Sequence, residues 1–278
     1  MGVHHGLPPA GRRGARRQEG DPMTESVFEL RGIDMHYGYV RALDGIDVTV
    51  RHGEVVGLLG DNGAGKSTLL KVMSGAHQPT SGTILVHGEP TTFASPSDST
   101  AAGVQMVYQD LALVEAQDIA TNLNLGREIL RKGPLGWLGF VDHKAQRKRA
   151  ADELDRLGVR TAPVTRPVEM LSGGQRQVVA LARAATRVTG ERNGVLLLDE
   201  PTAALGYEQT RQVRALIRRM AEQGVACVLV THDLPLAAAV CDRIVVLNRG
   251  RKVADVTAAE TDNDQLVGWI TGARESMF

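Results

Sequence analysis

The chain has few cysteines, few aromatic residues and no excess of charge of either sign. Its two cysteines, Cys227 and Cys241, are too few for a disulfide framework and lack the spacing of a zinc site. Lysine and arginine together number 32, as do aspartate and glutamate, and aromatic residues make up 4% of the 278 positions. Proteins that bind nucleic acid are usually more basic, and single-strand binders need stacking rings. The composition therefore argues against a nucleic-acid partner.

Long hydrophobic runs are also missing. No apolar stretch reaches the roughly 18 to 20 residues that a membrane span needs. The N-terminus carries Arg12, Arg13, Arg16 and Arg17 but no apolar segment, so it is not a signal peptide. We expect residues 1–22 to form a disordered basic tail or to precede a natural start at Met23. Contact of this tail with anionic lipid is a less favoured alternative.

An alternation of strand and helix patterns begins near residue 27. Segments 27–35 and 45–53 have the partial alternation of antiparallel strands. Four continuous apolar runs follow, which is typical of strands covered on both faces. These runs are 54–59, 104–108, 194–199 and 225–230, and helical patterns occupy 66–75, 142–157, 173–188 and 207–223. The order predicts an α/β protein with a largely parallel sheet.

The alternation is interrupted at one place and ends in a different pattern. Residues 111–172 contain no convincing apolar strand and predict a helical insertion. Residues 243–256 predict a hairpin that turns at 248–250, and 261–273 predict a short final helix. We therefore divide the chain into core residues 23–110, a helical subdomain at 111–189, and a second core part at 190–278.

Polar residues follow each of the four apolar runs. The first run leads into "GDNGAGKST", the second ends at Gln109, and the third ends at Asp199 and Glu200. The fourth ends at Thr231 and His232. Ligands bind at the carboxyl ends of strands in open parallel sheets. We therefore expect these chain-distant groups to meet in one crevice.

The loop after the first run has the chemistry of a phosphate site. Residues 60–67, "GDNGAGKS", match G-x-x-x-x-G-K-[ST] between a predicted strand and a predicted helix. Glycines let backbone N–H groups surround phosphate oxygens at a helix N-terminus that favours anions. Lys66 would reach the β- and γ-phosphates, and the Ser67 hydroxyl would bind Mg²⁺. A glycine turn with an incidental lysine is the alternative.

The two carboxylates at 199 and 200 complete the predicted chemistry. Asp199 suits a water-mediated hold on Mg²⁺. Glu200 is placed to orient an attacking water or accept its proton. His232 would contact the γ-phosphate. Taken alone, the adjacent carboxylates would indicate a solvated turn and the histidine a structural residue, so these roles depend on the phosphate loop.

A second glycine pair lies at 173–174 in "LSGGQ". Ser172 and Gln175 form a capping box for the helix that follows. Two glycines in the first turn weaken that helix, because each costs about 1 kcal/mol relative to alanine. The capping box explains Ser172 and Gln175 but does not explain Gly173 and Gly174.

Together these motifs resemble the ATP-binding cassette ATPases. The phosphate loop, Gln109, "LSGGQ", "VLLLDEPT" and "THD" occur in that family's order over nearly everything after residue 26. The resemblance implies a P-loop, RecA-like core with a largely parallel sheet, an N-terminal antiparallel β subdomain and an inserted α-helical subdomain. It also implies that two cassettes dimerise head to tail. The helix that begins at the signature "LSGGQ", residues 171–175, in one cassette then faces the γ-phosphate held by the other.

The resemblance assigns residues to three roles. Tyr37 matches the aromatic residue that stacks on adenine; Tyr39 is a weaker candidate, and a core tyrosine is the alternative. The nucleotide-binding residues are Tyr37, Gly60, Asp61, Asn62, Gly63, Ala64, Gly65, Lys66, Ser67, Thr68, Ser172, Gly173, Gly174 and Gln175. The catalytic residues are Glu200 as base, His232, Gln109 and Lys66. The Mg²⁺ site comprises Ser67, Gln109 and Asp199.

Two details refine the resemblance. Gly206 replaces the aspartate that usually follows "DEPTAAL" and crosses the dimer interface, which puts the coupling of the two sites in doubt. The segments "RALDGIDVTVRHGEVVGLLGDNGAGKSTLLKVMSGAHQPTSGTILVHGEP" and "FASPSDSTAAGVQMVYQDLALV" are similar to uptake ATPases for ribose, xylose and fructose. Many of those carry two fused cassettes, whereas this chain has one phosphate loop and one signature.

The resemblance thus implies a membrane-associated ATPase that uses ATP and Mg²⁺. It would be peripheral on the cytoplasmic face and pair with a second cassette, transmembrane permease subunits and, indirectly, an extracytoplasmic sugar-binding protein. The apolar segment 133–140 would face the permease or form a satellite core. The alternatives are an importer of another solute such as branched-chain amino acids, a cassette ATPase without a transport role, and a nucleotide-binding module without turnover.

Overall fold

The computed structural model describes residues 26–107, 111–189, 194–203 and 205–278. The N-terminal part is an antiparallel sheet in the order β2-β1-β4-β5. Its strands are β1 (Ser26–Tyr37), β2 (Val40–Arg51), β4 (Ser81–Val86) and β5 (Glu89–Thr91). The pairing of β1 with β2 confirms the antiparallel strands predicted near 27–35 and 45–53. The strands β4 and β5 and the short helix α2 (Pro96–Ala101) were not predicted.

The second sheet has six strands in the order β10-β9-β3-β8-β7-β6. Its strands are β3 (Val55–Gly60), β6 (Val104–Val107), β7 (Val195–Asp199), β8 (Ala226–Val230), β9 (Arg243–Asn248) and β10 (Arg251–Thr257). The pairings from β9 to β6 are all parallel, as the continuous apolar runs predict. Only β10 is antiparallel, because it is the second strand of the predicted hairpin.

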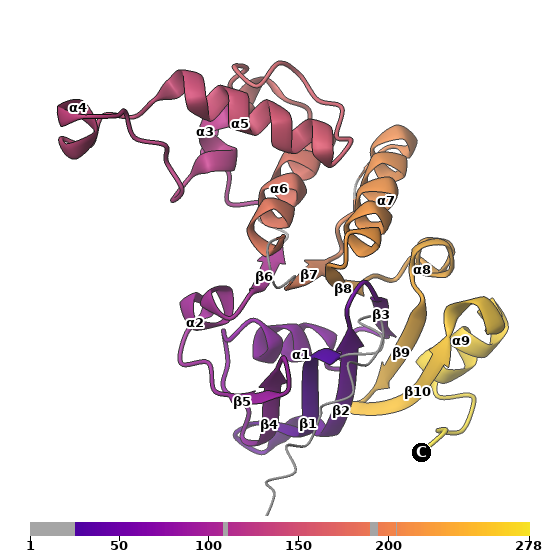
Figure 1. The fold of residues 1–278 in the computed structure, drawn as a ribbon. Coiled ribbons are helices and arrows are strands. Elements are labelled where there is room, and N and C mark those ends of the chain that lie inside the picture. The colour runs from indigo at the N-terminus through magenta and orange to yellow at the C-terminus, as the bar shows by residue number, and fades with distance from the viewer. Residues whose placement is uncertain (1–25, 108–110, 190–193, 204) are drawn as a thin grey trace, which may run out of the picture.

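Both faces of the parallel sheet are buried, which explains why its strands are continuously apolar. In β3, Val55 and Leu59 belong to one hydrophobic cluster, while Val56 and Leu58 belong to the other. This alternation follows from the two-residue period of a strand. Helices cover the first face, and the antiparallel sheet with helix α1 (Lys66–Met73) covers the second. Figure 1 shows α1 between the two sheets.

The longer helices match their predicted positions to within two residues. They are α5 (His143–Arg156), α6 (Gly173–Val188) and α7 (Tyr207–Glu222), and the final helix is α9 (Asn263–Thr271). Helix α8 (Leu234–Val240) was not predicted, and a 3₁₀ turn, η3 (Ala258–Glu260), follows β10. The capping box of Ser172 and Gln175 is present, and α6 begins where it predicts.

The helical insertion predicted for 111–172 is confirmed. It contains α3 (Ile119–Asn124), α4 (Pro134–Trp137), α5 and the 3₁₀ turn η2 (Val168–Met170). Asp118 caps α3 by accepting a hydrogen bond from the Thr121 N–H, and Asp142 caps α5 in the same way from Ala145. Figure 1 shows these helices together at the end of the molecule away from the antiparallel sheet. Across the described ranges, no helix is long and apolar enough to cross a membrane.

Candidate nucleotide site

The phosphate loop lies between β3 and α1, as its sequence predicts. Gly65 precedes the helix with φ 106°, a conformation that favours glycine. A Cβ atom on Gly60 would lie 2.4 Å from the carbonyl oxygen of Leu247, so that position has no room for a side chain. The glycines of this loop are therefore required by its backbone path.

The first turn of α1 presents free backbone donors. Among the described residues, the N–H groups of Gly63, Gly65, Lys66, Ser67 and Thr68 have no hydrogen-bond acceptor. Helix α1 also lacks a side-chain cap at its N-terminus. Unpaired N–H groups at a helix N-terminus form an anion site, because the helix dipole adds to their partial positive charge.

Lys66 is the first residue of α1, and its side chain reaches back over the loop. Its Nζ donates hydrogen bonds to the carbonyl oxygens of Gly60 and Asp61, at 2.8 Å and 2.9 Å. The ammonium group is therefore held over the same concavity as the free N–H groups. An anionic ligand there would meet a full positive charge as well as backbone donors.

A pocket of about 390 Å³ opens at the loop. It is lined by Val40, Arg41, Ala42, Asn62, Gly63, Gly65, Lys66, Ser67, Thr68, Arg249 and Gly250. The contributions of β2 and of the β9–β10 turn were missed from the sequence. Strand β9 is parallel to β3, so its carboxyl end lies at the same edge of the sheet. Two backbone bonds join the turn to the site: the Gly250 N–H donates to Ala64, and the Asp44 N–H donates to Gly250.

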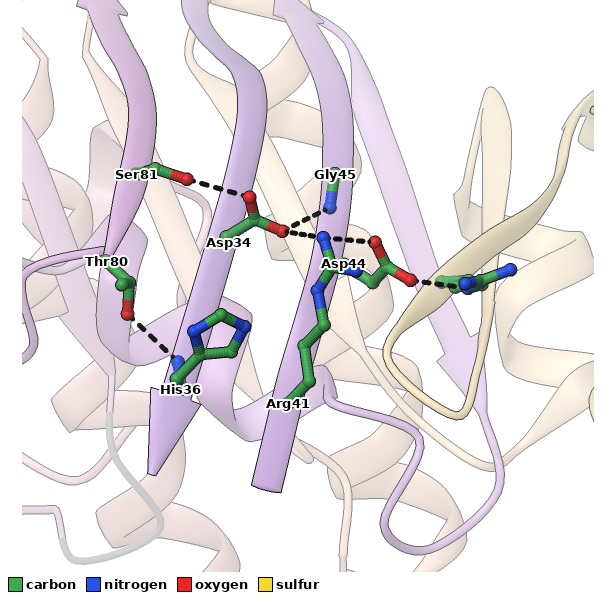
Figure 2. A network of polar contacts seen from close by, with 8 residues as sticks. Asp34, His36, Arg41, Asp44, Gly45, Thr80 and Ser81 are labelled. Atoms are coloured by element: carbon green, nitrogen blue, oxygen red, sulfur yellow. Dashed lines mark hydrogen bonds and ion pairs between the residues drawn. The ribbon is translucent and has the colours of Figure 1, made fainter. Parts of the chain in front are cut away.

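A polar network fixes the β2 wall of this pocket (Figure 2). Asp34 accepts hydrogen bonds from the Arg41 guanidinium at 2.6 Å, the Ser81 hydroxyl at 2.7 Å and the Gly45 N–H at 3.0 Å. Arg41 also pairs with Asp44. The Arg41 hydrogen bond, followed by those from Ser81 and Gly45, lowers the pKa of Asp34 to about 2. Asp34 is therefore ionised at neutral pH and can anchor β2 beside the loop.

Glu200 and His232 meet at the ends of two neighbouring strands. Glu200 follows β7 and His232 follows β8, and Glu200 Oε1 lies 2.9 Å from His232 Nδ1. Glu200 has a left-handed backbone with φ 48°, which is uncommon for a residue with a side chain and is typical of functional sites. The structure thus brings together the polar residues that follow β7 and β8, as the sequence predicted.

Asp199 lies next to Glu200 and within electrostatic reach of Lys66. Burial raises the pKa of Asp199, and so does the neighbouring Glu200 carboxylate, while Lys66 and Lys71 lower it. Its carboxylate accepts no hydrogen bond from any described residue, and the same is true of the Ser67 hydroxyl. These unpaired oxygens fit a divalent cation that also binds phosphate oxygens. Among the described residues, no group of three His, Cys, Asp or Glu side chains could hold a metal alone.

The predicted adenine-stacking residue is accessible. Tyr37 ends β1 and is 42% exposed, with its ring edge-on to His77 at a centroid distance of 5.8 Å. Tyr39 is fully exposed, so the alternative of a core tyrosine is wrong for both. Neither ring lines the pocket at the phosphate loop. Gln109 lies outside the described residues.

The signature residues do not join the phosphate site within one chain. Ser172 Oγ accepts from the Gln175 N–H, and Gln175 Oε1 accepts from the Ser172 N–H. Neither these residues nor the two glycines line the pocket at the phosphate loop. A Cβ atom on Gly174 would meet Gln209 at 2.3 Å, whereas one on Gly173 would meet nothing within 4 Å. Packing within the chain therefore accounts for Gly174 but not for Gly173.

Gly206 precedes α7 as its N-cap residue. Its φ of −73° and ψ of 169° are open to any residue, and the helix has no side-chain cap. The backbone therefore does not require glycine here. An aspartate would fit the same backbone, so folding does not explain why glycine replaces it here.

The fold and the loop define a phosphate-loop nucleotide-binding protein of the α/β class. Residues 43–203 match the ABC transporter domain family, and that match covers more than half of the chain. The chain therefore belongs to the ABC transporter family and is an ATPase of that family.

Relatives of known function support the same assignment. The chain is 42% identical over 253 residues to the fructose import ATP-binding protein FrcA of Rhizobium meliloti, covering 90% of this chain and 96% of that protein. It is 41% identical over 252 residues to the arabinose import ATP-binding protein AraG 2 of Burkholderia ambifaria, covering 90% of this chain but 46% of the relative. The chain thus spans about half the length of the second relative.

A solved structure has the same fold. The cbiO1 protein from Clostridium perfringens, part of the ABC transporter complex cbiONQ, superimposes with a TM-score of 0.71 at 27% sequence identity. The match covers 90% of this chain and 96% of cbiO1. The predicted fold class is confirmed by this likeness and by the two sheets described above.

Proposed function

We propose that this chain is the ATP-hydrolysing subunit of an importer for a simple sugar. The assignment of a sugar as the transported solute rests on one observation. Across nine-tenths of its length, the chain is similar to proteins named for fructose and arabinose import. The phosphate loop and the Glu200–His232 pair supply the ATPase chemistry. An importer of another small solute, such as a branched-chain amino acid, would need the same catalytic residues, so the relatives alone favour sugar.

The residues fit the binding of ATP with Mg²⁺. The N–H groups of Gly63 and of residues 65–68, which have no acceptor among the described residues, would surround the β- and γ-phosphates together with the Lys66 ammonium. Ser67 and Asp199 have side-chain oxygens that accept no hydrogen bond from a described residue, and these would bind a Mg²⁺ ion held by those phosphates. Gln109 would complete the surroundings of the ion. When bound, the ion would neutralise charge on the transferring phosphate. Tyr37 is accessible for stacking on the adenine.

Glu200 is the proposed base for hydrolysis. Its carboxylate would orient a water molecule and accept its proton, while His232 holds the carboxylate in place and contacts the γ-phosphate. This intact constellation argues against a nucleotide-binding module without turnover. It does not by itself distinguish transport from other ABC ATPase roles.

The nucleotide site is proposed to be completed by a second cassette. Ser172, Gly173 and Gly174 form a helix N-terminus that lies outside the phosphate pocket of the same chain. In a head-to-tail dimer of two copies, this N-terminus would face the γ-phosphate held by the partner copy. The exposed Gly173, which packing within the chain leaves unexplained, would allow that close approach.

Gly173→Val tests this arrangement. A Cβ atom added at 173 meets nothing within 4 Å and the position is exposed, so we expect the thermal stability of the isolated chain to stay unchanged. ATP hydrolysis should fall by about 10-fold or more, because the valine would separate the signature helix from the phosphate by more than hydrogen-bond distance. Calorimetry and a phosphate-release assay measure the two quantities. A stable variant with full activity would contradict the role of Gly173.

The proposed partners are permease subunits that span the membrane and a sugar-binding protein outside the cytoplasm. The chain would be peripheral on the cytoplasmic face. We expect affinity purification of this chain from native membranes to recover a multi-span permease and a binding protein that responds to a monosaccharide. Recovery of ribosomes, DNA or no membrane protein would leave the ATPase intact and overturn the transport role.

A further inference from the structure

The helical insertion carries a protruding arm, residues 129–141. Its base is a short antiparallel pair in which Leu130 bridges to Val141. The Arg131 N–H donates to Phe140 at 2.8 Å, and the Asp142 N–H donates to Ile129 at 2.7 Å. Helix α4 forms the tip, and Figure 1 shows it at the far end of the molecule, beyond α3 and α5.

The tip has a defined shape. The Gly136 N–H donates to Gly133 at 3.0 Å, and the Phe140 N–H donates to Leu135 at 3.0 Å. A Cβ atom on Gly136 would lie 1.7 Å from the Arg131 carbonyl oxygen, so the backbone packs too closely at Gly136 for any side chain. The side chains of the tip are therefore presented by a folded element.

Those side chains are apolar and exposed. Trp137 is 92% exposed, Leu138 67% and Phe140 53%, and Leu130 and Leu135 are nearly half exposed. None of them belongs to either hydrophobic cluster of the described chain. The alternative that 133–140 form a satellite core is therefore wrong. Several large apolar side chains exposed side by side mark an interaction surface.

The charge of the arm has one sign. Arg131 and Lys132 are its charged residues, and the arm contains no carboxylate. Both are exposed, and neither side chain forms an ion pair with a described residue. The two acids that flank the arm in the sequence accept other hydrogen bonds: Glu128 accepts from the Gly126 N–H, and Asp142 caps α5. The partner of the arm should therefore be apolar and anionic.

We propose that the arm contacts the anionic lipid surface of the membrane. Trp137, Leu138 and Phe140 enter the headgroup region, where tryptophan is favoured because its ring is apolar and its N–H polar. Arg131 and Lys132 pair with lipid phosphates, and basic residues beside an apolar insertion strengthen such binding. This contact is independent of the proposed sugar and of the dimer.

The two tryptophans of the chain make the test direct. Trp269 is 4% exposed and donates its Nε1–H to Glu275, so vesicles should leave its emission unchanged. We expect vesicles of phosphatidylcholine with phosphatidylglycerol to shift the fluorescence of the full chain to shorter wavelength. Pure phosphatidylcholine should give a smaller shift, and 0.5 M salt should reduce the effect. Trp137→Phe should sediment with the anionic vesicles yet lose the shift.

Removal of the two cations of the arm tests their proposed contact with anionic lipid. Arg131→Gln with Lys132→Gln should lower vesicle affinity by about 10- to 30-fold, since each cation near an anionic surface adds roughly fivefold. The matched control, Lys148→Gln with Arg211→Gln, removes two exposed cations from α5 and α7 and should bind as the parent does. Both variants should keep the ATPase rate of the isolated chain.

Two outcomes would overturn the lipid contact. In the first, the chain sediments with anionic vesicles while the Trp137 emission is unchanged, which would place the binding at another segment such as the basic N-terminus. In the second, the emission shifts only when permease is present in the vesicles, which would make the arm a protein-docking element. Either result leaves the proposed ATPase and import functions untouched.

Discussion

Glu200→Gln should abolish ATP turnover while leaving ATP affinity close to that of the parent. Glutamine has the shape of glutamate and can still meet His232 Nδ1 across the 2.9 Å contact, so the site should keep its geometry. It cannot accept a proton from water. Loss of a general base typically lowers the rate by about 10²- to 10⁴-fold. Single-turnover hydrolysis and nucleotide titration measure the two properties.

The variant should also accumulate a dimer in the presence of ATP, because hydrolysis is the step proposed to reopen it. Sedimentation velocity with and without ATP reports this. Glu208→Gln is the matched control, since Glu208 is an exposed glutamate on α7 whose pair with Arg211 lies at the surface. Near-parental turnover in Glu200→Gln would remove Glu200 from the role of base.

Lys66→Ala should instead weaken nucleotide binding itself. The Lys66 ammonium is held over the loop by the carbonyl oxygens of Gly60 and Asp61, where it would meet the β- and γ-phosphates. Hydrogen bonds to charged groups contribute about 1.5–3 kcal/mol, so ATP affinity should fall roughly 10- to 100-fold. Isothermal titration with ATP and with AMP separates this effect, because AMP lacks the phosphates that Lys66 would contact.

Lys71→Ala serves as the control on the same helix. Lys71 is exposed in the last turn of α1 and does not line the pocket. Its loss should change ATP affinity by less than about twofold, since a screened surface charge contributes little. Equal losses in the two variants would show that the total charge of α1, rather than the position of Lys66, holds the nucleotide.

The sequence predicts a helix or strand well where nearby residues indicate both its type and the residues at which it begins and ends. Helix α6 begins at the residue that the capping box indicates, because the side chains of Ser172 and Gln175 each accept a hydrogen bond from the other's backbone N–H. Strand β3 is apolar throughout because both of its faces are covered. Helix α8 has seven residues and was missed, although Asp233 caps it and a proline lies in its first turn.

The parts that were missed depend on long-range packing. Strand β4 pairs with β1, more than 40 residues earlier in the chain, and its own sequence is short. Arg249 and Gly250 line the pocket because β9 is parallel to β3, but a hairpin turn has the same local sequence whichever sheet it joins. The anchoring of Arg41 by Asp34 and Asp44 likewise requires the register of β1 and β2.

Local sequence was most informative at the phosphate loop and at Glu200. Both follow strands whose carboxyl ends meet at one edge of the sheet, so their convergence could be predicted without strand order. The signature helix was different. Its glycines indicated a second anion site, but local chemistry alone could not place this site outside the pocket of its own chain, which only the family resemblance implied.

The central claim is that two chains share each nucleotide site, and a mixing experiment tests it most directly. Lys66→Ala lacks a working phosphate loop, and Gly173→Val lacks a working signature. A mixed dimer of these variants still contains one intact site, formed by the loop of one chain and the signature of the other. A chain with both substitutions, mixed with the parent, contains none.

We therefore expect ATP-dependent association, measured by energy transfer between labelled chains, for the two single variants mixed together. Neither variant alone should associate, and neither should the double variant mixed with the parent. Association in that last mixture, or its absence between the two single variants, would contradict a site completed by the second chain.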